Sequence, residues 1–530
     1  MTSTATVAPS RGLARLSERL ESVLTALAAK RFLPVLILLA GLLPSAWLLY
    51  ELRDTPQFGL FSDDVMYIGA AESLAHNATY RESALPGDPW QTKYPPGYPL
   101  MLAAILKWNP AARNFWIMVH SWVWMAVASF ALAWAMRQAS LTPVQAAIVG
   151  ALWAANPFGA NAAVMAFAEA PFCAVLFLAL GLAQRLDKAA TWKAVLVGLL
   201  MGISCLIRSA GIFAVFGLVV WLLWRRSLKT AFWFGISASI LPAIWMLWSR
   251  AHMPATSGPV AQYYFDYGAR WLQDVRHAGL GSILVMNVSF SVKSVGEWLI
   301  PASISPLLPV LYTILLGFGC AVLADWAGGP ITAVALATMG FQVFWNWPPS
   351  ERFFLPVAPA FLGAGMALLS SRPAFLRIFT LVIVASADIY GIADLAGKYG
   401  TERYTGFPPV YSFIKTELPA DAVILGDDRV WLFTGRKAVG MLAPMEYFYL
   451  KRPDSELTFF MGYKDVARQF GAGYLLAAPE VRWDATFDRG EQLSTAIRAD
   501  PDLERIFSQN GVELFRIRTN PPGSLGSAAP

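Results

Sequence analysis

Long runs of apolar residues recur through the first 400 residues and restrict the folds open to this chain. The first runs from Phe32 to about Tyr50, and others approach the roughly 20 residues that a helix needs to cross a bilayer. Only 14% of the 530 residues are charged and 56% are hydrophobic, which excludes an ordinary soluble domain. The sequence therefore predicts an α-helical polytopic membrane protein.

The hydropathy pattern predicts about eleven membrane-spanning helices. They are expected at 32–50, 115–136, 144–163, 164–184, 194–207, 211–224, 231–248, 298–322, 331–347, 353–371 and 375–395. Basic residues such as Arg137 and Arg225 mark alternate connections, which places these connections and residues 1–31 in the cytoplasm. The first apolar run is long for a signal-peptide core, so we expect an uncleaved anchor. An odd number of spans places the C-terminus outside.

Several kinds of site are not indicated by the sequence. The three cysteines each lie inside an apolar run, and the four histidines form no metal-binding pair. The net charge of +6 comes from Lys and Arg beside apolar segments, which favours membrane orientation over nucleic-acid binding. No metal site is predicted, and a requirement for a divalent metal stays open.

The composition changes after about residue 396, where charged residues become dense. The runs AVILGD, YLLAAP and VELFRIR resemble strands, and a helix is expected over Glu491–Phe507. About 130 residues are enough to bury a separate core. We therefore predict a small α/β domain on the outer face over residues 396–530, ending in a flexible tail. An acceptor platform, a lid and an inert stabiliser are all open as its role.

The most polar part of the membrane module, residues 32–395, is the predicted outer loop over 51–114. It carries Asp63 and Asp64, followed by Lys93 beside Tyr94 and two prolines. The aspartates are either helix-capping residues or catalytic ones, and Lys93 is either an interfacial anchor or a ligand-binding residue. Adjacent residues of a helix point about 100° apart, so only one aspartate can face a given site.

Three further charged residues adjoin apolar spans. Glu169 in AFAEAPF and Arg208 in CLIRSAG are costly there unless they are partnered, which favours a functional role. Arg352 in SERFFLPVAP is either functional or an ordinary anchor at the end of a span. A second outer loop, about 249–297, carries aromatic residues that fit an interfacial belt, namely Tyr263, Tyr264, Tyr267 and Trp271.

Several of these runs resemble one family in order along most of the chain. SDDVMYIGAAESL and KYPPGYPLMLA are similar to the first outer loop of membrane glycosyltransferases of the GT-C fold. The resemblance is to bacterial relatives of protein O-mannosyltransferases and of the lipid A aminoarabinose transferase. AFAEAPFCAVLFLAL, GLLMGISCLIRSAGIF, ERFFLPVAP and TGRKAV look like later segments of that family.

The resemblance implies roles for individual residues. Asp63 would be the catalytic base, and Asp64 stands where many members carry Glu, which leaves its role open. Lys93 and Arg352 would contact a lipid phosphate. We also expect Tyr94, Glu169 and Arg208 to bind substrate.

A lipid-linked sugar donor is favoured on physical grounds as well. The outer face of a bacterial inner membrane has no pool of nucleotide sugars, and the chain has no Walker or Rossmann motif. A polyprenyl phosphate is already acidic, so its departure needs cations rather than a proton donor. We therefore predict an inverting glycosyltransferase that acts on an acceptor hydroxyl of an envelope lipid, glycan or protein. The alternatives are a flippase or transporter of lipid-linked glycans, with ionisable groups near the midplane, and an inactive scaffold.

Overall fold

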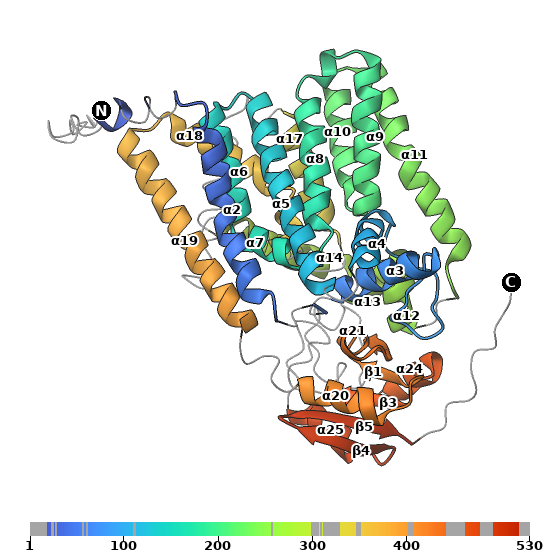
Figure 1. Ribbon diagram of the computed structural model, residues 1–530. Coiled ribbons are helices and arrows are strands. Elements are labelled where there is room, and N and C mark those ends of the chain that lie inside the picture. Colours follow the sequence, from blue (N-terminus) through green and yellow to red (C-terminus); the bar gives the residue numbers. More distant parts are fainter. Residues whose placement is uncertain are drawn as a thin grey trace, which may run out of the picture.

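A bundle of long helices with a small α/β domain at one end makes up the computed structural model of the chain (Figure 1). The structure describes residues 19–22, 26, 29–55, 58–59, 62–109, 113–255, 258–297, 307, 310, 329–345, 351–400, 407–440, 462–477 and 491–518.

Four of the described helices are long and apolar enough to cross a membrane: α2 (Leu33–Leu52), α5 (Arg113–Gln138), α11 (Leu228–His252) and α19 (Ala374–Gly400). The 20 residues of α2 extend over about 30 Å, which matches a bilayer core. Shorter apolar helices lie beside them: α8 (Glu169–Ala183), α9 (Thr191–Ile207), α10 (Gly211–Trp224), α17 (Pro330–Gln342) and α18 (Ala358–Ser370). A short turn of 3-10 helix, η1 (Leu186–Lys188), joins α8 to α9.

One predicted span is a broken helix. Helices α6 (Pro143–Ala155) and α7 (Pro157–Val164) meet at 63° and together are long enough to form a span. Asn156 is extended because a proline follows it, and its side chain accepts a hydrogen bond from the Phe158 N–H at 3.1 Å. The sequence at this point therefore ends one helix and begins another.

The predicted number of spans, about eleven, is not confirmed. By length and composition, four described helices qualify, or six if each bent pair counts as one span. Each predicted span outside 298–322 coincides with one of the helices above, and 298–322 lies mostly outside the described residues. The span expected over 164–184 is wrong at its start, since α7 continues to Val164 and α8 begins at Glu169.

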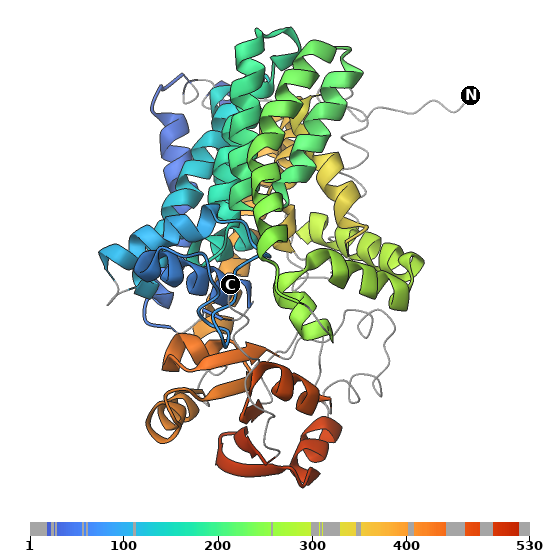
Figure 2. The same ribbon diagram turned by 90° about the vertical axis from the view of Figure 1, so that its right-hand side faces the viewer.

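A layer of shorter helices separates the bundle from the α/β domain. It contains α3 (Asp63–Asn77) and α4 (Gly97–Trp108) from the first outer loop. The segment predicted as a second outer loop forms α12 (Gly258–Phe265), α13 (Tyr267–Ala278) and α14 (Leu280–Glu297), with 102° between the last two. Figure 2 shows both groups between the long helices and the α/β domain. The 3-10 turn η2 (Glu351–Phe354) precedes α18.

The first outer loop packs tightly against the end of α9. Gly97 begins α4, and a Cβ atom at this position would lie 2.5 Å from the carbonyl oxygen of Leu206. Only glycine allows the two backbones to approach so closely. This contact brings the turn that precedes α4 next to Arg208.

The α/β domain contains a five-stranded sheet in the order β2-β1-β3-β5-β4. Strands β1, β2 and β3 are parallel, whereas β5 is antiparallel to both β3 and β4. Its described elements are α20 (Phe407–Glu417), β1 (Val423–Gly426), α21 (Arg429–Thr434), β2 (Lys437–Gly440), α24 (Tyr463–Phe470), β3 (Tyr474–Ala477), α25 (Glu491–Ala499), β4 (Leu503–Gln509) and β5 (Val512–Ile517).

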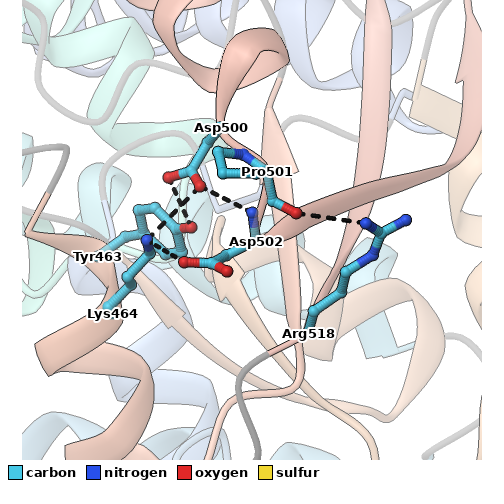
Figure 3. Close-up of polar contacts among 6 residues, drawn as sticks. All are labelled: Tyr463, Lys464, Asp500, Pro501, Asp502 and Arg518. Carbon is cyan, nitrogen blue, oxygen red and sulfur yellow. Dashed lines mark hydrogen bonds and ion pairs between the residues drawn. The ribbon is translucent and has the colours of Figure 1, made fainter.

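Strands β1, β3 and β5 lie within the three runs predicted to be strands, but the helix predicted over Glu491–Phe507 is wrong in its second half. That helix ends at Ala499, and the chain then enters β4, which pairs with β5. Side chains fix the turn between α25 and β4 (Figure 3). The Tyr463 hydroxyl donates to Asp500 at 3.0 Å, and Lys464 pairs with Asp502. A proline at 501 also cannot supply a helical N–H. Local propensity was thus overridden by strand pairing.

The domain contacts the first outer loop directly. The Ala438 N–H of β2 donates to the Ala84 carbonyl at 3.0 Å, and Arg113 of α5 donates to the Leu432 carbonyl of α21 at 2.6 Å. Strand β2 and helix α21 therefore lie against the segment that carries the predicted site.

Candidate active site

Asp63 is the first residue of α3 and is held by two neighbours. Its Oδ2 accepts a hydrogen bond from Arg352 Nη2 at 2.7 Å, and its Oδ1 accepts one from the Tyr94 hydroxyl. Burial raises the pKa of Asp63, but Arg352, Lys93 and these hydrogen bonds outweigh burial, so the pKa is lowered overall. The carboxylate is therefore ionised at neutral pH and lies among cations.

Asp64 points away from this cluster. It is fully buried, and its Oδ2 accepts a hydrogen bond from the Gly59 N–H at 2.6 Å. Burial, with a smaller contribution from Asp63, raises the pKa of Asp64 to about 7. The two aspartate side chains thus differ in direction and environment. Asp64 holds the residues before α3 through its hydrogen bond with Gly59.

Lys93 is a buried lysine surrounded by tyrosine rings. Its Nζ lies 3.5 Å from the ring centroid of Tyr263 and 4.9 Å from those of Tyr94 and Tyr267. Cation–π attraction offsets part of the cost of burying the ammonium group. Burial nevertheless lowers the pKa of Lys93 to about 7, although Asp63 raises it.

Glu169 forms ion pairs with two arginines, one of which also pairs with Asp63. It begins α8, where the partial positive charge of the helix N-terminus favours a carboxylate. It pairs with Arg208 and lies 3.7 Å from Arg352 Nη1. Arg208 occupies the extended break between α9 and α10, and Arg352 lies in η2. Charges therefore alternate along the series Asp63, Arg352, Glu169 and Arg208, which offsets the desolvation of each group.

The structure brings most of the predicted site residues together. One network joins the side chains of Asp63, Tyr94, Arg352, Glu169 and Arg208. Lys93 joins it through the ring of Tyr94, whereas Asp64 does not belong to it. The roles assigned to these residues stay predictions.

Sequence reasoning missed the tyrosines around Lys93. Tyr263, Tyr264 and Tyr267 were expected in an interfacial belt, but Tyr264 is buried and the other two face the lysine. The rings of Tyr263 and Tyr267 instead surround a buried ammonium group. The available signal was their density within a polar segment, which does not reveal a partner some 170 positions away.

Within the part of the chain that the structure describes, no group of three or more His, Cys, Asp or Glu side chains is arranged to hold a metal ion. The cations present in the candidate site are side chains of Lys and Arg.

Solved structures resemble this chain over most of its length. The structure of ArnT from Cupriavidus metallidurans bound to undecaprenyl phosphate matches with a TM-score of 0.58 at 12% identity, covering 92% of this chain and 98% of that one. The apo oligosaccharyltransferase of Archaeoglobus fulgidus matches with a TM-score of 0.53 at 13% identity, covering 85% and 70%. This chain has the GT-C fold. A third GT-C structure, the archaeal oligosaccharyltransferase AglB with an inhibitory peptide and a dolichol-phosphate, matches with a TM-score of 0.52 at 12% identity, covering 94% and 76%.

The GT-C assignment rests on structure alone. No family model matches the sequence, and no curated protein matches it either. At identities of 12–13%, these structural matches show the fold alone. The activity of this GT-C chain therefore has to be argued from its own site.

Proposed function

We propose that the chain is a glycosyltransferase that moves a sugar from a polyprenyl-phosphate donor to an acceptor hydroxyl. The observation that carries this proposal is the Asp63 carboxylate at the head of α3, ionised and surrounded by Arg352, Lys93 and Tyr94. The GT-C fold supports the same class, since matching structures contain undecaprenyl phosphate or a dolichol-phosphate. The acceptor would belong to an envelope lipid, glycan or protein.

The reaction needs one base and several cations. The acceptor oxygen attacks the anomeric carbon and forms the new glycosidic bond, while the bond from that carbon to the phosphate oxygen breaks. Asp63 takes the acceptor proton, and the phosphate leaves with the bonding electrons. A single displacement of this kind inverts the anomeric configuration.

The basic residues match the charge that develops on the leaving group. The phosphate gains negative charge as the sugar departs, and hydrogen bonds to it from Arg352 and Lys93 strengthen in the transition state. A phosphate beside Arg352 would also draw the guanidinium from Asp63, whose carboxylate would then be available to the acceptor. Arg208, paired with Glu169, is the third candidate phosphate ligand.

The location of the charged network favours transfer over transport. Alternating-access transporters bind their cargo near the bilayer midplane. Helix α3, which begins at Asp63, and helix α4, which follows the turn that contains Lys93, lie instead at the end of the bundle, against the α/β domain (Figure 1). An inactive scaffold would not need alternating buried charges in this place.

We propose that residues 1–31 face the cytoplasm and that the α/β domain is periplasmic, in a bacterial inner membrane. Basic residues at alternate connections support this orientation. An alkaline phosphatase fusion near Gly400 should therefore be active, and one after Arg226 should be inactive. The reverse pattern would overturn both the orientation and the argument for a lipid-linked donor.

Donor capture should weaken as the pH rises through about 7, because Lys93 has a pKa of about 7 and loses its charge there. Asp63 stays ionised over this range because its pKa is lowered. The specificity constant kcat/KM for the donor should therefore fall above neutrality, since it reports the free enzyme. Lys93→Arg keeps a cation at all these pH values and should flatten the profile. A flat wild-type profile from pH 6 to 9 would contradict this role.

Mass analysis of envelope lipids and glycans tests the proposed function in cells. A deletion strain should lack one sugar residue on one envelope component, and the intact gene should restore it. The Asp63→Asn gene should not restore it, although its product reaches the membrane. Restoration by this variant would reject the proposal.

A further inference from the structure

One buried carboxylate of the α/β domain contacts the residue just before Asp63. The Ser62 hydroxyl donates a hydrogen bond to Asp428 Oδ2. Ser62 precedes α3, and its carbonyl accepts the Met66 N–H at 3.1 Å in the first turn of that helix. The contact therefore joins the C-terminal domain to the start of the helix that carries Asp63.

Asp428 is itself fixed from several directions. It follows β1, at the carboxyl ends of the parallel strands, and is 7% exposed. Its Oδ1 accepts hydrogen bonds from the Tyr264 hydroxyl at 2.6 Å and from the Gly440 N–H at 2.8 Å. In open α/β sheets this edge usually forms a ligand crevice. Here it holds Ser62 and α12 of the membrane module.

The backbone of Ser62 needs such a partner. Its φ is 55°, a region that is sterically disfavoured for any residue other than glycine. Conformations of this kind persist only where the surroundings enforce them. The hydrogen bond to Asp428 is one such constraint.

A second contact holds the chain just before α3. Gly59 has a φ of 95° and lies against the side chain of Arg429, so that a Cβ at this position would overlap it. Arg429 is held in turn by Asp427, 2.8 Å away. The Gly59 N–H donates to Asp64, the second residue of α3. The α/β domain thus touches the chain on both sides of residues 60–61.

We propose that Asp428 is a positioning residue, which sets the place of Asp63 through its hydrogen bond to Ser62. This inference rests on the proposed role of Asp63 as the base. It gives the α/β domain a part in catalysis that neither a lid nor an inert stabiliser would have. Misplacement of a catalytic group by about 1 Å can cost roughly 10²-fold in rate.

A double-mutant cycle with Ser62→Ala and Asp428→Ala tests the bond from both sides, because an asparagine at 428 could still donate to the Ser62 hydroxyl. Each variant should lower kcat by up to roughly 10²-fold and leave the donor KM unchanged, because the donor phosphate is held elsewhere. The kcat of the double variant should be no lower than that of the less active single variant, since both changes break the same bond. If Asp428→Ala fails to fold, Ser62→Ala alone still decides the kcat effect.

Hydrogen exchange supplies a measurement that does not depend on activity. In both single variants the amides of Gly59 and Met66 should exchange faster, while the strands of the sheet keep their protection. Asp502→Asn is the matched control: Asp502 precedes β4, the edge strand farthest from β1 and β2, and pairs with Lys464. Its turnover and its exchange at Met66 should equal those of the wild type.

The outcomes separate this inference from the proposed function. Absence of transfer by the wild type would reject the proposed function, whereas hydrogen exchange would still report on positioning. Multiplicative losses in the cycle, unchanged exchange at Gly59 and Met66, or loss of protection throughout the sheet in Ser62→Ala would each overturn the positioning role. A local change in exchange without a change in kcat would overturn it too.

Discussion

Asp63→Asn should lower the transfer rate by roughly 10²- to 10⁴-fold and leave the protein folded. The amide keeps the size of the carboxylate and can still accept the hydrogen bond from Tyr94. It cannot accept a proton from the acceptor hydroxyl at neutral pH. Turnover in proteoliposomes and a melting curve on the same sample measure the two effects.

The neighbouring aspartate provides the matched control. Asp64→Asn should lower turnover far less, because Asp64 lies outside the charged network and its amide can still accept the Gly59 N–H. Its cost in stability should be about 1 kcal/mol or less. Full activity of Asp63→Asn with an inactive Asp64→Asn would reverse the assignment, and full activity of both would reject the mechanism.

Arg352→Ala should lower turnover by roughly 10²-fold or more, by analogy with the loss of one donor from an oxyanion hole. Arg352 contacts both Asp63 and Glu169, so it is placed to follow the charge that develops on the donor phosphate. Glu169 keeps Arg208 as a partner after the substitution, so we expect the fold to survive. Arg352→Lys should be intermediate, because lysine keeps the charge but not the planar fork.

The rate of donor cleavage at saturating donor separates this role from simple anchoring. Arg225→Ala is the control, since Arg225 pairs with Asp187 in a more exposed site. This variant should turn over at the wild-type rate. Unchanged turnover of both Arg352→Ala and Lys93→Ala would show that these residues only anchor the protein at the interface.

The sequence predicted the helical module well because its physical signals are local. Apolar runs are read over a few residues, and most predicted spans coincide with helices. The break at Asn156-Pro157 was not predicted: one unbroken span was expected over 144–163. Helix boundaries were predicted less well where contacts with distant residues set them. Helix α8 starts at Glu169, whose carboxylate faces two arginines. The helix predicted over Glu491–Phe507 was wrong because β5 recruits its second half into the sheet.

The candidate site was predictable in its charges but not in its arrangement. Charged residues beside apolar segments pointed to Asp63, Glu169, Arg208 and Arg352, because a bilayer penalises such groups. No local pattern indicates that Asp63 meets Arg352, 289 positions away, or that Ser62 meets Asp428, 366 positions away. Such pairs depend on how helices and domains dock.

In the proposed reaction, the bond from the sugar to the donor phosphate breaks while Asp63 takes the acceptor proton. The most direct test places the purified protein in vesicles with labelled polyprenyl-phosphate sugars and an extract of envelope acceptors. We expect polyprenyl phosphate to be released and the label to appear on an acceptor, with both signals lost in Asp63→Asn. A donor that crosses the bilayer intact, at the same rate in wild type and Asp63→Asn, would contradict this reaction.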